Sequence, residues 1–165
     1  MRILILDDDP NRHKAFKRLF IGHLDTHVET ASDCIEALRY KDWDILFIDR
    51  DLSDWGRPYH EAGTGNDVAE WLWENPDRIP PHVIVHSINV SGSRAIYTVI
   101  RANAPKGTVV ERFPFAWQNL KVKRPSKDIV LKKPEDHEGL WGRFDEFTTD
   151  YMVIKEKSSG RAVRS

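Results

Sequence analysis

The sequence has a single cysteine, no strong excess of charge of either sign, and no long hydrophobic run. With one cysteine, Cys34, the chain cannot form an internal disulfide or a cysteine-based metal site, which fits a reducing compartment. Its 25 basic and 26 acidic residues give a formal net charge of -1, so no overall field directs it to nucleic acid or to an anionic membrane. No apolar run approaches the ~20 residues of a membrane helix. The run Ile3–Leu6 stops at three aspartates, which a signal peptide would not carry. We therefore expect a soluble, intracellular protein that contacts no membrane.

Short apolar stretches alternate with amphipathic ones over the first 110 residues of this 165-residue chain. The apolar stretches predict strands, and the stretches between them carry apolar residues at helical spacing. Such an alternation predicts parallel strands joined by right-handed crossovers, with helices on both faces, which is a doubly wound five-stranded α/β sheet. The predicted strands are Arg2–Leu6, Thr26–Thr30, Ile45–Ile48, His82–Val85 and Thr108–Val110.

The helix starts have recognisable capping signals. Asp9 followed by Pro10 predicts a cap and a first helical residue, and Asp33 with Glu36 resembles a capping box. The further helices are predicted over Asp67–Glu74 and Ser91–Asn103. The loop Leu52–Thr64 is longer than the ~2 to 6 residues usual between a strand and a helix, so we expect it to be functional.

Polar side chains follow three of the predicted strands, and ligands of doubly wound sheets bind at the carboxyl ends of the strands. Several carboxylates gathered there would repel one another unless some are protonated or a cation neutralises them, and a divalent ion is the simpler answer. Hard oxygen donors favour Mg²⁺ or Mn²⁺ over zinc. Each aspartate alone is also explained as an ordinary cap or turn residue. The residues in question are Asp7, Asp8 and Asp9 after the first strand, Asp49 and Asp51 after the third, and His86, Ser87 and Asn89 after the fourth.

Two helix starts carry small polar residues. Ser91, Gly92 and Ser93 begin the fourth helix, where backbone N–H groups and hydroxyls can hold an anion with help from Arg94, although a simple cap is the alternative. Thr64 begins a similar turn at the end of the long loop.

The acidic ends of the first and third strands and the Ser87 position resemble the receiver domain of two-component signalling over roughly residues 1–115. The resemblance implies the flavodoxin-like strand order 2-1-3-4-5, Mg²⁺ at Asp7 and Asp8, and phosphate transfer to Asp49. One departure is Arg112, which stands where receivers carry a lysine. Another is the second acid, Asp51.

In these departures the sequence is similar to a divergent branch of the receivers, the cyclic-phosphate-processing receiver-like family. The resemblance implies a metal-dependent phosphoesterase that acts on a cyclic phosphate of a nucleotide or RNA end. The matching segments are Asp7-Asp8, Asp49-Arg50-Asp51-Leu52, Thr64-Gly65 and His86-Ser87-Ile88-Asn89 with Gly92. Arg50 stands where that family often has histidine.

On this hypothesis the metal ligands are Asp7, Asp8, Asp49 and Asp51, and the catalytic residues are Asp49, Asp51 and His86. His86 is the predicted general acid or base because an unperturbed histidine has a pKa of ~6.5. The alternative is a non-catalytic receiver that is phosphorylated at Asp49 or simply binds a partner. The residues predicted to bind the phosphate or substrate are Ser87, Asn89, Ser91, Gly92, Ser93, Arg94 and Thr64.

The last fifty residues fit no receiver pattern. We interpret residues 116–157 as a basic and aromatic extension that packs on the domain or on a second subunit, and residues 158–165 as a disordered tail. A cluster of basic residues predicts contact with RNA, or otherwise a solvated surface. We expect the protein in the cytoplasm of a bacterial or phage-infected cell. The cluster comprises Lys121, Lys123, Arg124, Lys127, Lys132 and Lys133.

Overall fold

The computed structural model describes residues 1–52, 59–87, 89–113, 129–132 and 151–154. Except for the backbone of Lys132, the predicted basic cluster lies outside these residues, as does the predicted tail. Among the described helices, none is both long enough and apolar enough to cross a membrane.

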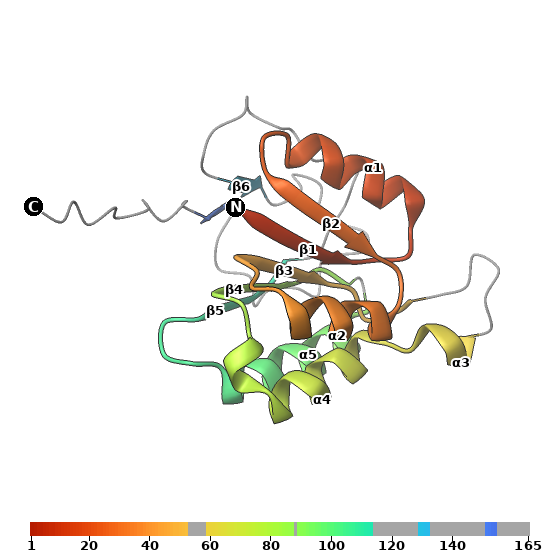
Figure 1. Cartoon of the computed structure of the whole chain (residues 1–165), viewed down its shortest axis with the longest axis vertical. Coiled ribbons are helices and arrows are strands. Elements are labelled where there is room, and N and C mark those ends of the chain that lie inside the picture. The colour runs from red at the N-terminus through yellow and green to blue at the C-terminus, as the bar shows by residue number, and fades with distance from the viewer. Residues whose placement is uncertain (53–58, 88, 114–128, 133–150, 155–165) are drawn as a thin grey trace, which may run out of the picture.

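Five parallel strands form the central sheet, in the order β2-β1-β3-β4-β5 (Figure 1). This order confirms the predicted doubly wound sheet. The strands are β1 (Arg2–Leu6), β2 (Leu24–Val28), β3 (Ile45–Ile48), β4 (His82–Val85) and β5 (Val109–Arg112). The helices are α1 (Pro10–Leu19), α2 (Ala31–Tyr40), α3 (Tyr59–Ala62), α4 (Gly65–Glu74) and α5 (Val90–Asn103), with a 3-10 turn η1 (Pro76–Arg78). A separate antiparallel pair consists of β6 (Ile129–Lys132) and β7 (Tyr151–Ile154).

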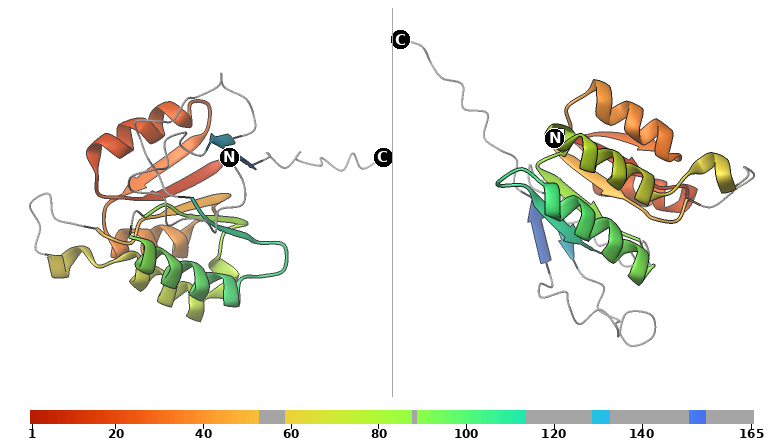
Figure 2. Two further views of the ribbon diagram at one scale, coloured as in Figure 1. Left: turned by 180° about the vertical axis from the view of Figure 1, so that it is seen from behind. Right: turned by 90° about the horizontal axis from the view of Figure 1, so that it is seen from below.

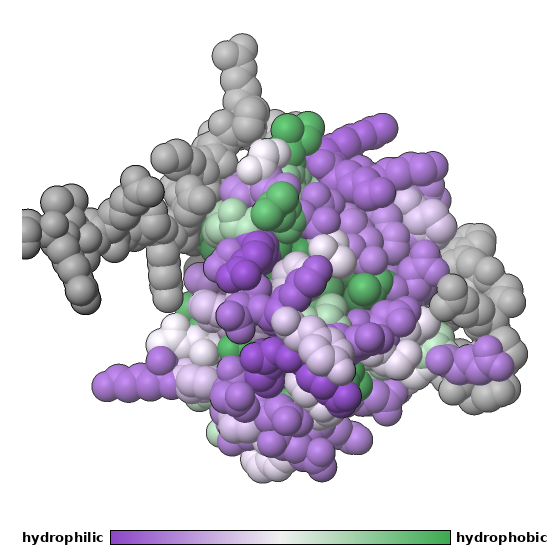
Figure 3. Space-filling view, viewed as in Figure 1, coloured by the Kyte–Doolittle hydropathy of each residue, from purple (hydrophilic) through white to green (hydrophobic). Residues whose placement is uncertain are grey.

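Helices cover both faces of the sheet, as the views in Figure 2 show. Side chains alternate along each strand, so one face of the sheet carries Ile3, Ile5 and Phe47 and the other carries Leu4 and Leu6. The first face packs against α1 and against Ile129 and Ile154 of the β6–β7 pair. The second face packs against α2, α4 and α5. The face of the molecule seen in Figure 3 is largely hydrophilic, with the hydrophobic residues in small separate patches.

The starts of two helices, α2 and α4, differ from the prediction for identifiable reasons. Helix α2 begins before Asp33, because Thr30 is its N-cap and the Thr30 Oγ1 accepts a hydrogen bond from the Asp33 backbone N–H at 3.1 Å. The predicted cap at Asp33 is therefore wrong. Helix α4 begins at Gly65, two residues earlier than predicted, and the short helix α3 interrupts the predicted long loop.

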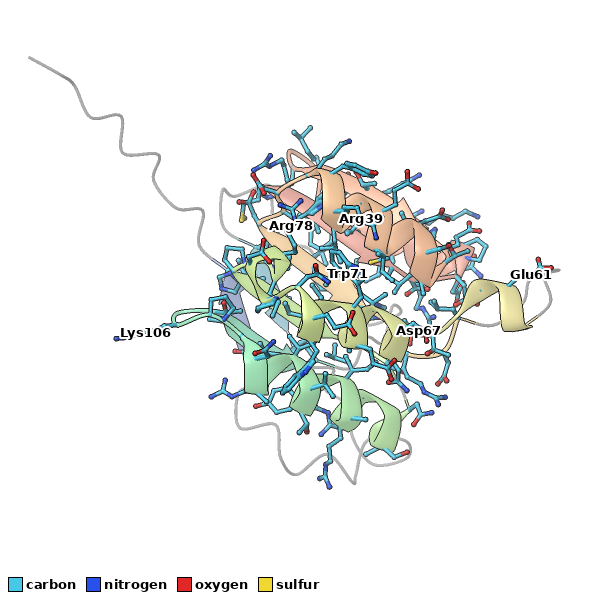
Figure 4. All side chains as sticks on the ribbon, turned by 60° about the horizontal axis from the view of Figure 1, so that its bottom comes forward. Arg39, Glu61, Asp67, Trp71, Arg78 and Lys106 are labelled. Atoms are coloured by element: carbon cyan, nitrogen blue, oxygen red, sulfur yellow. The ribbon has the colours of Figure 1, made fainter. Side chains whose placement is uncertain are left out.

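A side chain from η1 holds the end of α2 (Figure 4). The Arg78 Nε donates to the Leu38 carbonyl at 3.0 Å, and its Nη2 donates to the Arg39 carbonyl. The Arg39 guanidinium in turn lies 5.9 Å from the ring centroid of Trp71 on α4. These contacts tie α2, α4 and η1 together at the edge of the sheet away from the acidic strand ends.

Candidate functional site

Three side chains meet where β1, β3 and β4 end. Asp7, Asp49 and His86 each follow one of these neighbouring strands, and each offers a ligand atom within 4.8 Å of the others. Backbone hydrogen bonds extend the parallel ladder past the strand ends, from the Asp49 N–H to the Leu6 carbonyl and from the His86 N–H to the Ile48 carbonyl, both at 3.0 Å. The three residues are 0%, 2% and 3% exposed, respectively. The sheet therefore fixes an Asp-Asp-His group that can hold a metal ion.

The two buried carboxylates share one arginine from the first turn of α1. The Arg12 Nε donates to both oxygens of Asp7, at 2.9 and 2.7 Å, and its Nη2 donates to the Asp49 Oδ2 at 2.6 Å. The same nitrogen lies 3.6 Å from the Asp8 Oδ1. Burial alone would lower the pKa of Arg12, but the hydrogen bond and charge of Asp7, with the charge of Asp49, outweigh it and raise that pKa. Arg12 is thus a fully charged counterion to three carboxylates.

The imidazole of His86 is packed between aromatic rings and its strand. Phe16 and Phe47 lie edge-on to it at centroid distances of 5.5 and 6.1 Å. Burial lowers the pKa of His86, although the charges of Asp7 and Asp49 act in the opposite direction. The Leu6 carbonyl, 3.3 Å from Nε2, can only accept, so Nε2 carries the proton. In this tautomer the lone pair of Nδ1 faces the Asp7 Oδ2 at 3.7 Å.

This donor set fits a divalent cation. The carboxylates of Asp7 and Asp49 are hard oxygen donors of the kind that Mg²⁺ and Mn²⁺ prefer, and the Asp7 Oδ2 lies 3.7 Å from the His86 Nδ1. Asp8 lies at the rim, and its pKa is raised, mainly by burial and also by the charges of Asp7 and Asp49. Asp51 stands further out, with its side chain 39% exposed and ion-paired with Arg50. Of the four predicted metal ligands, the structure groups Asp7 and Asp49 with His86, while Asp8 and Asp51 lie outside that group.

The start of α5 lies beside Arg50. The Asn89 Oδ1 caps this helix by accepting from the Gly92 N–H at 2.9 Å and from the Ser91 hydroxyl at 3.2 Å. A Cβ on Gly92 would lie 2.7 Å from the Cδ of Arg50, so the missing side chain of the glycine makes room for the arginine. The backbone N–H of Asn89 donates to the Ser87 hydroxyl at 3.3 Å. Three residues predicted to bind phosphate, Asn89, Ser91 and Gly92, therefore form one turn next to the third strand end.

The other predicted phosphate ligands have different surroundings. The Ser93 hydroxyl donates to the Val90 carbonyl and accepts hydrogen bonds from Arg112 at 3.3 and 3.1 Å. Arg112 also donates to the Val90 carbonyl, so it holds the first turn of α5. Arg94 lines an open hollow along α5 together with Ser91.

The second predicted turn fixes α4 against β3. Both the backbone N–H and the hydroxyl of Thr64 donate to the Asp67 Oδ2, at 2.6 and 3.1 Å. The next residue, Gly65, packs so closely that a Cβ would lie 2.2 Å from the Asp49 carbonyl oxygen. The Thr64-Gly65 pair thus sets the distance between the helix start and Asp49.

Two residues at this edge were missed by reasoning from the sequence. They are Arg12 and His13, whose Nε2 donates to the Asp7 carbonyl at 2.6 Å. The available signal was a basic residue in the first turn of α1, where the helix dipole disfavours positive charge. A cation in that position indicates a nearby anion strong enough to compensate.

The strand order and the acidic ends of β1 and β3 define a receiver-type domain. The sequence profile described as "Cyclic-phosphate processing Receiver domain" matches residues 2–102, and the chain belongs to this family. A search of curated proteins finds no match.

Solved receiver domains share the fold. The non-phosphorylated HemR receiver domain from Leptospira biflexa is 19% identical with a TM-score of 0.51, and the match covers 71% of this chain and 85% of that one. The response regulator TrrA from Thermotoga maritima, solved in complex with Mg²⁺ and BeF, is 15% identical with a TM-score of 0.50, over 70% and 86% of the two chains.

Proposed function

We propose that this protein is a metal-dependent phosphoesterase that opens a cyclic phosphate of a nucleotide or of an RNA end, with Mg²⁺ or Mn²⁺ held by Asp7 and Asp49. The observation that carries the proposal is the buried group of two carboxylates and one imidazole at the carboxyl edge of the sheet. Ligands of doubly wound sheets bind at this edge. The description of the family supports a cyclic phosphate as the substrate class.

Opening the ring adds a water molecule to phosphorus, breaks one phosphorus–oxygen bond and leaves the released oxygen in need of a proton. A bound divalent ion supplies a positive charge for the phosphate and lowers the pKa of a coordinated water. In the protein, His86 is suited to the proton transfer because burial keeps it neutral near pH 7. Its Nε2–H bond to the Leu6 carbonyl fixes the ring, so Nδ1 is the atom that accepts a proton.

The start of α5 is suited to holding the phosphate. Asn89 is partly buried and Ser91 is exposed, and the Arg50 side chain lies against Gly92. Backbone N–H groups at a helix start and a nearby guanidinium are favourable partners for an anion. The Arg50 guanidinium pairs with Asp51 at this edge and places a positively charged group near the helix start. The hydrogen bonds of Ser93 and Thr64 assign these two residues to holding the helix starts.

The test is turnover of cyclic nucleotides and of an RNA oligonucleotide that ends in a cyclic phosphate, with Mg²⁺, with Mn²⁺ and with EDTA. Phosphorus NMR distinguishes the cyclic ester from the linear phosphomonoester. We expect product only with a divalent ion, and its loss in Asp49→Asn. The matched control is Asp42→Asn, at a carboxylate that is 81% exposed near the opposite end of β3.

Two outcomes would contradict the proposal. Intact substrates across the whole panel with either ion would exclude the activity, and equal turnover with EDTA would exclude the metal dependence. Incubation with acetyl phosphate separates the non-catalytic alternative, because a receiver used only as a switch would gain one labile phosphate at Asp49 and release no product.

A further inference from the structure

We propose that Arg12 is a built-in cation of the metal site, which holds the carboxylates in the ion-free protein and has to leave them when a divalent ion binds. The inference rests on the proposed metal site but not on the proposed reaction. Its basis is the position of one guanidinium between Asp7 and Asp49, the same two carboxylates that belong to the Asp-Asp-His group.

The contacts of Arg12 use the oxygen atoms that a metal ion would need. Both oxygens of Asp7 accept from Arg12, and one of them also accepts the Asp9 backbone N–H at 2.8 Å. On Asp49, Arg12 takes Oδ2, while Oδ1 accepts the Asp51 backbone N–H at 3.3 Å. A cation bound to Asp7 would therefore meet the positive charge of the guanidinium at the same oxygen atoms.

The electrostatic balance leads to the same conclusion. Asp7 is fully buried and Asp49 is 2% exposed, so without a cation the two carboxylates would be a costly pair of like charges. Arg12 provides the compensating positive charge in the ion-free protein, and a divalent ion would provide a larger positive charge at the same oxygen atoms. The guanidinium and the ion are thus competitors for one site.

Geometry also allows the arginine to leave. Arg12 comes from the first turn of α1, its side chain is 14% exposed, and its bonds are made at the end of a long flexible chain. Moving it needs no change in the sheet that fixes Asp7 and Asp49. Once displaced, it lies at the rim beside the carboxylates, where a phosphate would approach. Arg12 is a positioning residue that sets the affinity for the ion.

The experiment measures Mn²⁺ and Mg²⁺ affinity of the full chain by calorimetry in Arg12→Met, which removes the charge but keeps a long side chain. We expect the ion to bind about tenfold more tightly, or better, because the competing charge-assisted bonds are gone. The matched control is Arg18→Met, an exposed arginine on the same helix, whose affinity should equal that of the wild type. Arg12→Lys keeps a charge without the bridging geometry and should fall between.

A second measurement uses the wild type, so it does not depend on the variant folding. In NMR spectra without metal, the Arg12 Nε–H should exchange slowly with solvent, and Mg²⁺ should abolish that protection. Equal or weaker ion binding by Arg12→Met, or a protected Nε–H in the Mg²⁺-bound wild type, would overturn the proposal. If Arg12→Met gains ion affinity but no form turns over a cyclic phosphate, only the proposed reaction fails.

Discussion

Two glycines of the candidate site should respond to the same substitution with different losses of stability. Replacing Gly65 with alanine places a Cβ 2.2 Å from the Asp49 carbonyl oxygen and 3.0 Å from the Arg50 Cα, both backbone atoms. Real Cβ atoms essentially never approach other atoms closer than 3.0 Å. The strand and the helix start therefore have to move apart. Overpacking of this kind typically costs about 1–3 kcal/mol, and we expect Gly65→Ala at the upper end, about 2–3 kcal/mol.

Gly92 is the matched control because it also lies in the first turn of a helix. A Cβ there meets only the Cδ, Cγ and Nε of Arg50 among its three nearest atoms, at 2.7 to 2.9 Å. The Arg50 side chain is 28% exposed and can turn away. Alanine in a helix is also favoured over glycine by roughly 0.5–1 kcal/mol. We expect the free energy of unfolding of Gly92→Ala to stay within about 1 kcal/mol of the wild type.

The assay is urea unfolding of both variants, followed by circular dichroism, with a thermal scan for comparison. A loss of about 2–3 kcal/mol corresponds to a fall of roughly 4–12 °C in melting temperature for a chain of this size. Mn²⁺ binding should weaken in Gly65→Ala as well, because the displaced carbonyl belongs to Asp49. Equal stabilities of the two variants would refute the reasoning, since it depends on the difference between a backbone and a side-chain obstacle.

Three further predictions concern the folded state. The pKa values of His27 and His86 are lowered, chiefly by burial, so the unfolded chain binds protons more tightly and the free energy of unfolding should decrease as the pH falls below about 6.5. Urea titrations at pH 7.5 and 5.5 test this, and equal stabilities would contradict it. Arg78→Met removes the hydrogen bonds at the end of α2 and should destabilise the protein by about 1–2 kcal/mol, whereas Arg101→Met at an exposed position should not. Cys34 is fully buried and its thiol pKa is raised by burial, so a thiol reagent should label it only after unfolding; rapid labelling of the native protein would count against the buried placement.

The sheet was predictable from the sequence because its strands are buried on both faces. Continuous apolar runs such as Ile45–Ile48 give a signal that does not depend on distant residues. β2 is an edge strand with only partly buried or exposed residues, so its predicted range was displaced from Leu24–Val28. The start of α2 was misjudged because Thr30 and Asp33 are both good capping residues, and only the backbone geometry decides between them.

The gathering of the acidic groups was predictable, but their individual roles were not. Topology alone brings Asp7, Asp49 and His86 to one edge, since each ends a strand of a parallel sheet. Whether a neighbouring acid such as Asp51 joins them depends on the direction of its side chain. Here Asp51 pairs with Arg50 at the rim, a contact between adjacent residues that no periodicity encodes.

Arg12 shows why charge has to be counted at a site rather than along a chain. The sequence predicted that clustered carboxylates need protonation or a cation, and a divalent ion was the simpler solution. The fold supplies a second solution by returning the first turn of α1 over the end of β1, which brings Arg12 onto Asp7. Because Arg12 neutralises the carboxylates, the site remains folded without a metal ion, and an ion can bind by displacing the guanidinium. The fold therefore does not require the divalent ion, and changes at Arg12 should alter the affinity of the site for that ion.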